Sequence, residues 1–158
     1  MLREMSLPTA TQDALLSLYR GEASAVEAYD RVLDKFKGQP EAPTLGEIRD
    51  EHESARRRLD LELQRNGLKT PESSGGWGVF ASALYSVAAL VNDEAPLQVL
   101  QRGEEVGSAD YARAIDADGL EATFVQQLRD DHMQCQAHHE RLQQLRDVIL
   151  NQPTRPMI

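Results

Sequence analysis

Two glutamates and three histidines interrupt stripes of the sequence that are otherwise apolar. Glu22 and Glu104 each stand where the three- and four-residue spacing of apolar residues requires an inward-facing side chain. His52, His132 and His139 interrupt two further stripes in the same way. A buried carboxylate is costly unless it is paired, protonated or bound to a metal ion. The spacing therefore predicts a polar cluster inside the protein.

Two tyrosines follow the same pattern as the glutamates. Tyr29 and Tyr111 lie two helical turns after Glu22 and Glu104, on the same stripes. A buried phenol needs a hydrogen-bond acceptor, and a carboxylate or an imidazole can serve. We therefore expect both tyrosines to belong to a buried polar network.

The elements that position these residues are predicted to be helices. The pattern predicts long helices over about 9–37 and 44–66, a short apolar helix over 78–91, and two more long helices, one from about 93 and one over 118–151. The pairs Thr44–Glu47 and Asp118–Glu121 have capping-box spacing, and Gly67 is placed to end a helix. The fold class is therefore all-α, a four-helix bundle with a crossover, in one domain over 1–158 with its core over about 9–151.

The first and second halves of the chain resemble each other. Segments 14–33 and 96–115 both contain the string Arg-Gly-Glu, with a tyrosine seven residues after the glutamate. Segments 48–52 and 128–132 match at nearly the same offset and in the same order. Two matches of this kind predict that the bundle is built from two repeated helical hairpins.

A short motif in the first helix resembles a known family. The pattern Gly-Glu-x-x-Ala-x-x-x-Tyr, at Gly21, Glu22, Ala25 and Tyr29, is similar to the first helix of rubrerythrin-type ferritin-like proteins. The loop Ser-Gly-Gly-Trp-Gly at 74–78 and the second Gly-Glu resemble a bacterial ferritin-like domain of unknown function. The resemblance covers about residues 10–150. It implies a ferritin-like four-helix bundle with a short crossover helix.

The resemblance also implies a metal site. In di-iron ferritin-like proteins each hairpin supplies one glutamate and one Glu-x-x-His motif. Carried over to this chain, the ligands are Glu22, His52, Glu104 and His132, and the metal is iron or manganese. The implied activity is iron oxidation or peroxide reduction.

One departure from the family pattern supports a different interpretation. Arg49 and Arg129 stand three residues before His52 and His132, where the family has the second glutamate. Buried ion pairs between Arg49 and Glu22, and between Arg129 and Glu104, would satisfy both carboxylates without a metal.

Two hypotheses about function therefore remain. The first, which we take as the main one, is a non-catalytic bundle that acts through self-association or partner binding. The alternative is a metal-binding protein, and the sequence leaves open whether the protein is an enzyme. His139 is expected to belong to the buried network, and His138 to point outward.

Composition limits the partners and the location. The net charge is -9, from 26 acidic and 17 basic residues, which disfavours nucleic acid and anionic membranes as partners. The apolar stretch over 79–91 is too short to span a bilayer, and the N-terminus lacks a signal-type apolar core. We therefore expect a cytoplasmic protein, and we expect the stretch 79–91 to favour a homodimer.

Overall fold

The computed structural model describes residues 6–72 and 92–152. In this part of the chain the fold consists of four helices and contains no strand: α1 (Thr9–Lys35), α2 (Ala42–Arg65), α5 (Glu94–Ile115) and α6 (Ala122–Leu150). The four long helices confirm the prediction of an all-α bundle. The expected short helix over 78–91, the loop over 74–78 and the expected dimer surface lie outside the described residues.

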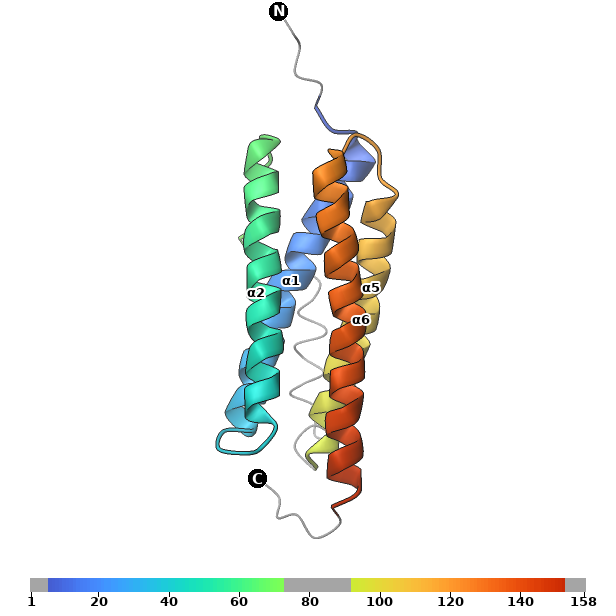
Figure 1. Cartoon of the computed structure of the whole chain (residues 1–158). Helices are drawn as coiled ribbons and strands as arrows, with labels where there is room; N and C mark the ends of the chain where they lie inside the picture. Colours follow the sequence, from blue (N-terminus) through green and yellow to red (C-terminus); the bar gives the residue numbers. More distant parts are fainter. Residues whose placement is uncertain (1–5, 73–91, 153–158) are drawn as a thin grey trace, which may run out of the picture.

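The helices are arranged in a square with antiparallel neighbours (Figure 1). α1 packs against α2 and α5, and α6 packs against α5, whereas α2 and α6 approach each other less closely. α2 ends and α5 begins at opposite ends of the bundle, so these two helices run in the same direction (Figure 1). This topology is that of a bundle with one long crossover connection.

The helix ends agree with the sequence at some positions and differ at others. Gly67 ends α2 in a left-handed conformation, φ 70°, and the Leu68 amide donates to the Leu63 carbonyl at 2.8 Å. Neither predicted capping box forms. Thr44 lies inside the first turn of α2, because this helix begins at Ala42.

The second predicted capping box fails for a different reason. α6 begins only at Ala122, so Asp118 lies in the preceding loop. Its carbonyl there accepts a hydrogen bond of 2.7 Å from the Thr11 hydroxyl of α1. Asp118 therefore joins the loop to α1 and does not cap α6.

The core consists of two apolar clusters separated by a polar layer. One cluster, which includes Leu15, Leu59 and Leu128, lies toward the end where α1 begins. The other, which includes Leu45 and Leu100, lies toward the opposite end. Between the two clusters each helix carries one of these buried polar residues: Glu22, His52, Glu104 and His138. The candidate functional site lies at this level of the bundle.

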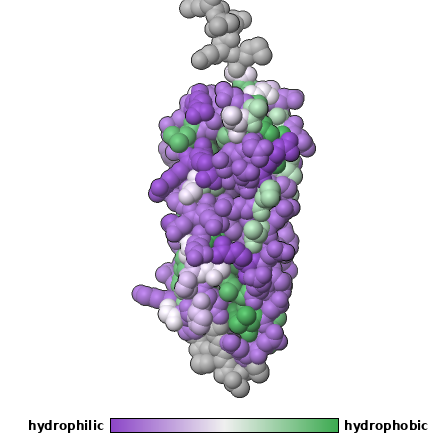
Figure 2. Space-filling view, viewed as in Figure 1, coloured by the Kyte–Doolittle hydropathy of each residue, from purple (hydrophilic) through white to green (hydrophobic). Residues whose placement is uncertain are grey.

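The face of the bundle seen in Figure 2 is predominantly polar. Figure 2 shows one face, on which apolar residues form small separate groups. None of the described helices is both long enough and apolar enough to cross a membrane.

The orientation of α2 can be tested with two leucines. Leu59 is 1% exposed and Leu61 is 62% exposed. Leu59→Ala should lower the free energy of unfolding by about 2 to 5 kcal/mol, because it leaves a cavity in the core. Leu61→Ala should change it by about 0.5 kcal/mol or less. Denaturant unfolding followed by circular dichroism measures both, and equal losses would contradict this orientation.

Candidate functional site

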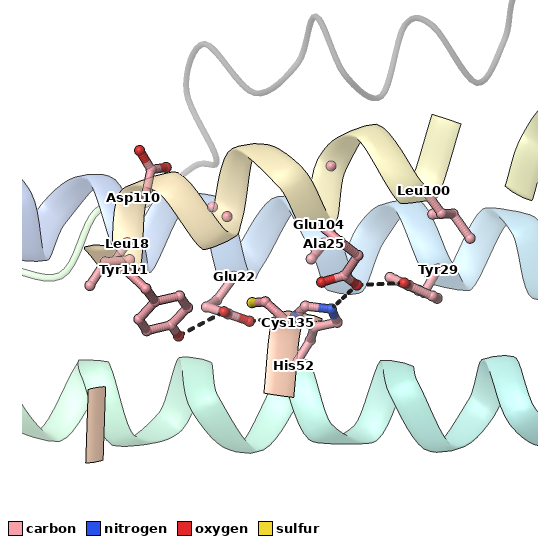
Figure 3. A pocket seen from close by; sticks show the side chains of 13 residues that line it. Leu18, Glu22, Ala25, Tyr29, His52, Leu100, Glu104, Asp110, Tyr111 and Cys135 are labelled. Atoms are coloured by element: carbon pink, nitrogen blue, oxygen red, sulfur yellow. Dashed lines mark hydrogen bonds and ion pairs between the residues drawn. The ribbon is translucent and has the colours of Figure 1, made fainter. Parts of the chain in front are cut away.

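Glu22 of α1 and Glu104 of α5 form the centre of the polar layer. Both are buried, as predicted, and each accepts a hydrogen bond from a tyrosine of the other helix (Figure 3). The Tyr29 hydroxyl donates to Oε1 of Glu104 at 2.6 Å, and the Tyr111 hydroxyl donates to Oε1 of Glu22 at 2.8 Å. Each tyrosine bonds the glutamate of the other helix, because the glutamate of its own helix is seven residues away, about 10 Å along the helix axis.

His52 of α2 lies between the two glutamates. Its Nδ1 is 2.7 Å from Oε2 of Glu22, and its Nε2 is 2.7 Å from Oε1 of Glu104. Burial alone would lower the pKa of His52, but the carboxylates of Glu104 and Glu22 raise it well above its usual value. Burial opposes ionisation of Glu104, but His52 and His138 hold the pKa of Glu104 below its usual range. In the absence of a metal, the imidazolium form of His52 therefore donates to both carboxylates.

His138 of α6 completes the polar layer. It is 2% exposed, and its Nε2 pairs with Oε2 of Glu51, on α2. Its Nδ1 lies 3.4 Å from Oε2 of Glu104, and neither of these two atoms makes a hydrogen bond within the described part of the chain. When His138 is protonated, these two atoms form an ion pair; when it is neutral with its proton on Nε2, toward Glu51, two buried lone pairs face each other across the gap.

Three of these side chains can serve as metal ligands. His52, Glu104 and His138 each offer one ligand atom, and these atoms all lie within 4.8 Å of one another. Each imidazole also contacts a second carboxylate, Glu22 for His52 and Glu51 for His138. Carboxylates in this position orient metal-binding imidazoles and fix which nitrogen faces the ion.

The space beside the cluster is small. A cavity of about 20 Å³ lies between α1 and α5, and Glu22, Tyr29, His52, Glu104 and Tyr111 are among the residues that line it (Figure 3). This is room for about one water molecule or one ion.

Cys135 also lines this cavity. Burial, together with the charges of Glu104 and Glu22, raises the pKa of its thiol, so Cys135 is a thiol when no metal is bound.

The prediction that His132 faces inward is wrong. His132 is partly exposed, and His138 takes its place in the polar layer. The anchors Leu128, Cys135 and Leu142 are buried as expected, but they recur every seven residues. Between two anchors seven residues apart, the inward-facing residue can stand either three or four positions after the first anchor. The helix buries positions 131 and 138, one residue before those expected.

The prediction that His139 belongs to the buried network is also wrong. Its side chain is 37% exposed and pairs with Glu105 at 3.0 Å on the surface, so it does not belong to the buried network. The prediction that its neighbour His138 points outward is wrong for the same reason, the rotation of α6 by one residue.

The predicted buried arginine pairs do not form. Arg49 is 30% exposed and pairs with Asp30 at 2.9 Å, and Arg129 is exposed. Each arginine directly follows a buried residue of its helix, so its side chain points about 100° away from the core. Glu22 and Glu104 are bonded by His52 and the tyrosines instead, and only Oε2 of Glu104 makes no hydrogen bond among the described residues.

Sequence reasoning undervalued the acidic residues beside the predicted histidines. The apolar spacing singles out neither Glu51 nor Asp131, yet Glu51 pairs with His138, and Asp131 is buried and pairs with Arg58 at 2.6 Å. A usable signal was present. On both α2 and α6, an acidic residue is followed seven positions later by a basic residue or a histidine, as in Glu51–Arg58 and Asp131–His138.

No family model, curated protein or solved structure matches the chain. The function is therefore inferred from the geometry of these residues.

The hydrogen bond between Tyr29 and Glu104 can be tested by removing one hydroxyl. Tyr29→Phe should lower the free energy of unfolding by about 1 to 3 kcal/mol, because a buried carboxylate loses a donor. Tyr19→Phe is the control, since its hydroxyl accepts a hydrogen bond from Arg56 in a partly buried setting. That change should cost about 0.5 kcal/mol. A smaller loss for Tyr29→Phe than for the control would contradict the network.

The network also predicts how stability depends on pH in chelator-treated protein. The raised pKa of His52 stabilises the fold fully below 6.5, its ordinary value, and this contribution is lost as the pH rises through the folded-state pKa. The lowered pKa of Glu104 stabilises the fold above 4.5, and this contribution is lost as the pH falls through the folded-state pKa. The thermal midpoint should therefore be highest between pH 4.5 and pH 6.5 and should fall toward alkaline pH.

Two histidine variants test this assignment. His52→Gln should weaken the fall of the thermal midpoint at alkaline pH, whereas His139→Gln should show the same fall as the wild type. A wild-type midpoint that does not change on the alkaline side would refute this assignment.

Proposed function

We propose that the protein binds one divalent transition-metal ion between His52, Glu104 and His138. One observation carries this proposal: the buried atoms Nδ1 of His138 and Oε2 of Glu104 lie 3.4 Å apart, without a hydrogen bond among the described residues. Buried polar atoms in folded proteins are nearly always satisfied by a partner, a water molecule or an ion. A cation held by both atoms would satisfy them together.

The donor set favours iron or manganese. Two imidazoles and one carboxylate are typical ligands of non-haem iron(II), and carboxylate oxygen also suits manganese. Three protein ligands leave coordination positions open, so a bound iron ion would supply redox chemistry toward a small molecule such as dioxygen or peroxide. Glu22 and Glu51 would hold the two imidazoles in orientation through their second nitrogens.

The position of the arginines supports this proposal. A guanidinium paired with each glutamate would both repel a cation and satisfy the carboxylates without a metal. Arg49 is partly exposed and Arg129 is exposed, and both lie away from Glu22 and Glu104.

We also propose that the chain is a ferritin-like bundle built from two copies of one hairpin. This is supported by interactions that occur twice, with the two halves of the chain exchanging roles. The hydrogen bond between Tyr29 and Glu104 corresponds to the one between Tyr111 and Glu22. The ion pair between Glu51 and His138 corresponds to the one between Asp131 and Arg58. In this correspondence Arg58, in the first half of the chain, takes the position that His138 has in the second half, so a fixed positive charge stands where a second site would need an imidazole. That difference favours one bound ion over two.

A second candidate function is a non-catalytic bundle that acts through self-association or partner binding. A specific observation favours it: His52 bonds both glutamates, and each glutamate accepts a hydrogen bond from a tyrosine. That part of the network is complete without an ion, so it stabilises the fold by itself.

Metal uptake distinguishes the two candidates. Anaerobic titration of chelator-treated protein with Fe(II) or Mn(II), followed by metal analysis, should give one ion per chain. His138→Gln should abolish this uptake, because it removes an imidazole ligand. His132→Gln and His139→Gln change the same residue type on the same helix outside the polar layer, and they should bind the ion as the wild type does.

Two results would overturn the metal proposal. Absence of uptake by the wild type would leave the non-catalytic bundle as the function. Loss of uptake in His132→Gln but not in His138→Gln would restore the ligand set that the ferritin-like resemblance implies.

A further inference from the structure

A second hollow lies next to the polar layer, between α5 and α6. Its volume is about 360 Å³, far larger than the cavity between α1 and α5. Both helices line it, with these side chains: Glu104, Glu105, Ser108, Cys135, Gln136 and His139.

The inner end of this hollow reaches one ligand of the metal site proposed above, Glu104. Glu104 and Cys135 are each 3% exposed, and both border the hollow. Oε2 of Glu104, the oxygen without a hydrogen bond among the described residues, belongs to this buried side chain. The hollow therefore borders the side chain of Glu104, whose Oε1 bonds His52 and Tyr29 and whose Oε2 makes no hydrogen bond among the described residues.

The outer end of the hollow suits a cation. Glu105 is 63% exposed and pairs with His139, which is 37% exposed. Ser108 and Gln136 add neutral oxygen atoms to the walls. Oxygen donors replace water around a divalent cation that sheds part of its hydration shell, and a cleft with a negative charge raises the local concentration of cations.

The other spaces beside the polar layer are less suitable. The hollow between α2 and α6 is lined by Asp50 and Glu51 but also by the fixed positive charge of Arg58, and Glu104 does not line it. The cavity between α1 and α5 has room for only about one water molecule.

We propose that the hollow between α5 and α6 is the site through which a divalent cation reaches Glu104, with Glu105 as the first carboxylate that it meets. This inference rests on the proposed metal site. The incoming cation replaces His139 as the partner of Glu105. It then passes Ser108 and Gln136 and is taken up by Glu104.

The rate of metal uptake tests this route. Chelator-treated full-length protein is mixed with Co(II) in a stopped-flow instrument, and the absorption of the bound ion is followed. Ser108→Trp, which fills the hollow, should slow uptake about tenfold or more without changing the final ion content. Glu105→Gln should slow uptake several-fold at low salt, and this difference should disappear at about 0.5 M salt.

Two matched variants control for general effects. Ala109→Trp adds the same side chain at the next position of α5, which is exposed and outside the hollow. Glu140→Gln removes the same charge from an exposed position of α6 outside the hollow. Both should take up Co(II) at the wild-type rate.

The outcomes separate this inference from the proposed function. Equal rates in Glu105→Gln and Glu140→Gln at low salt would overturn the route, while normal final uptake would leave the metal site standing. Equal rates in Ser108→Trp and Ala109→Trp would do the same. Absence of Co(II) binding by the wild type would overturn both. Glu105 is exposed, so its variant remains informative if Ser108→Trp does not fold.

Discussion

Two carboxylates buried in the middle of a helical bundle need a positive charge or several hydrogen-bond donors close to them, and His52 supplies both. Its two ring nitrogens lie 2.7 Å from Glu22 and from Glu104. One side chain of α2 thereby joins α1 to α5, and the tyrosines of those two helices complete the bonding. The register between α1, α2 and α5 depends on this arrangement, because a slip by one turn would leave a buried charge unpaired.

The same requirement explains how the fourth helix is held. α2 and α6 approach each other less closely than the other neighbouring helices, and ion pairs connect them across the gap. Polar side chains can bridge a distance that apolar contacts cannot. Because Glu51 takes one nitrogen of His138, the other nitrogen is left facing Glu104 in the core. The wide gap between α2 and α6 and the two atoms of the polar layer without hydrogen bonds thus both go with the pairing of Glu51 and His138.

The candidate site combines residues of different predictability. Glu22, Glu104, His52 and both tyrosines could be placed in the core from sequence, since each has apolar residues three and four positions away on its own helix. His138 could not, because two adjacent histidines on α6 fit the same apolar anchors. Local spacing indicates which face of a helix is apolar, but it does not fix the rotation of that helix to within one residue.

The sequence by itself determined the helical class, the four long helices and the inward position of the two glutamates, because these depend on interactions along one helix. The tertiary structure decided which residues become partners. It paired each tyrosine with the glutamate of the other helix, left Arg49 and Arg129 at the surface, and turned His138 rather than His132 into the core. Such choices depend on how one helix is rotated and shifted against its neighbours. That geometry is set by the packing of all four helices together, so the residue spacing along any one helix does not predict it.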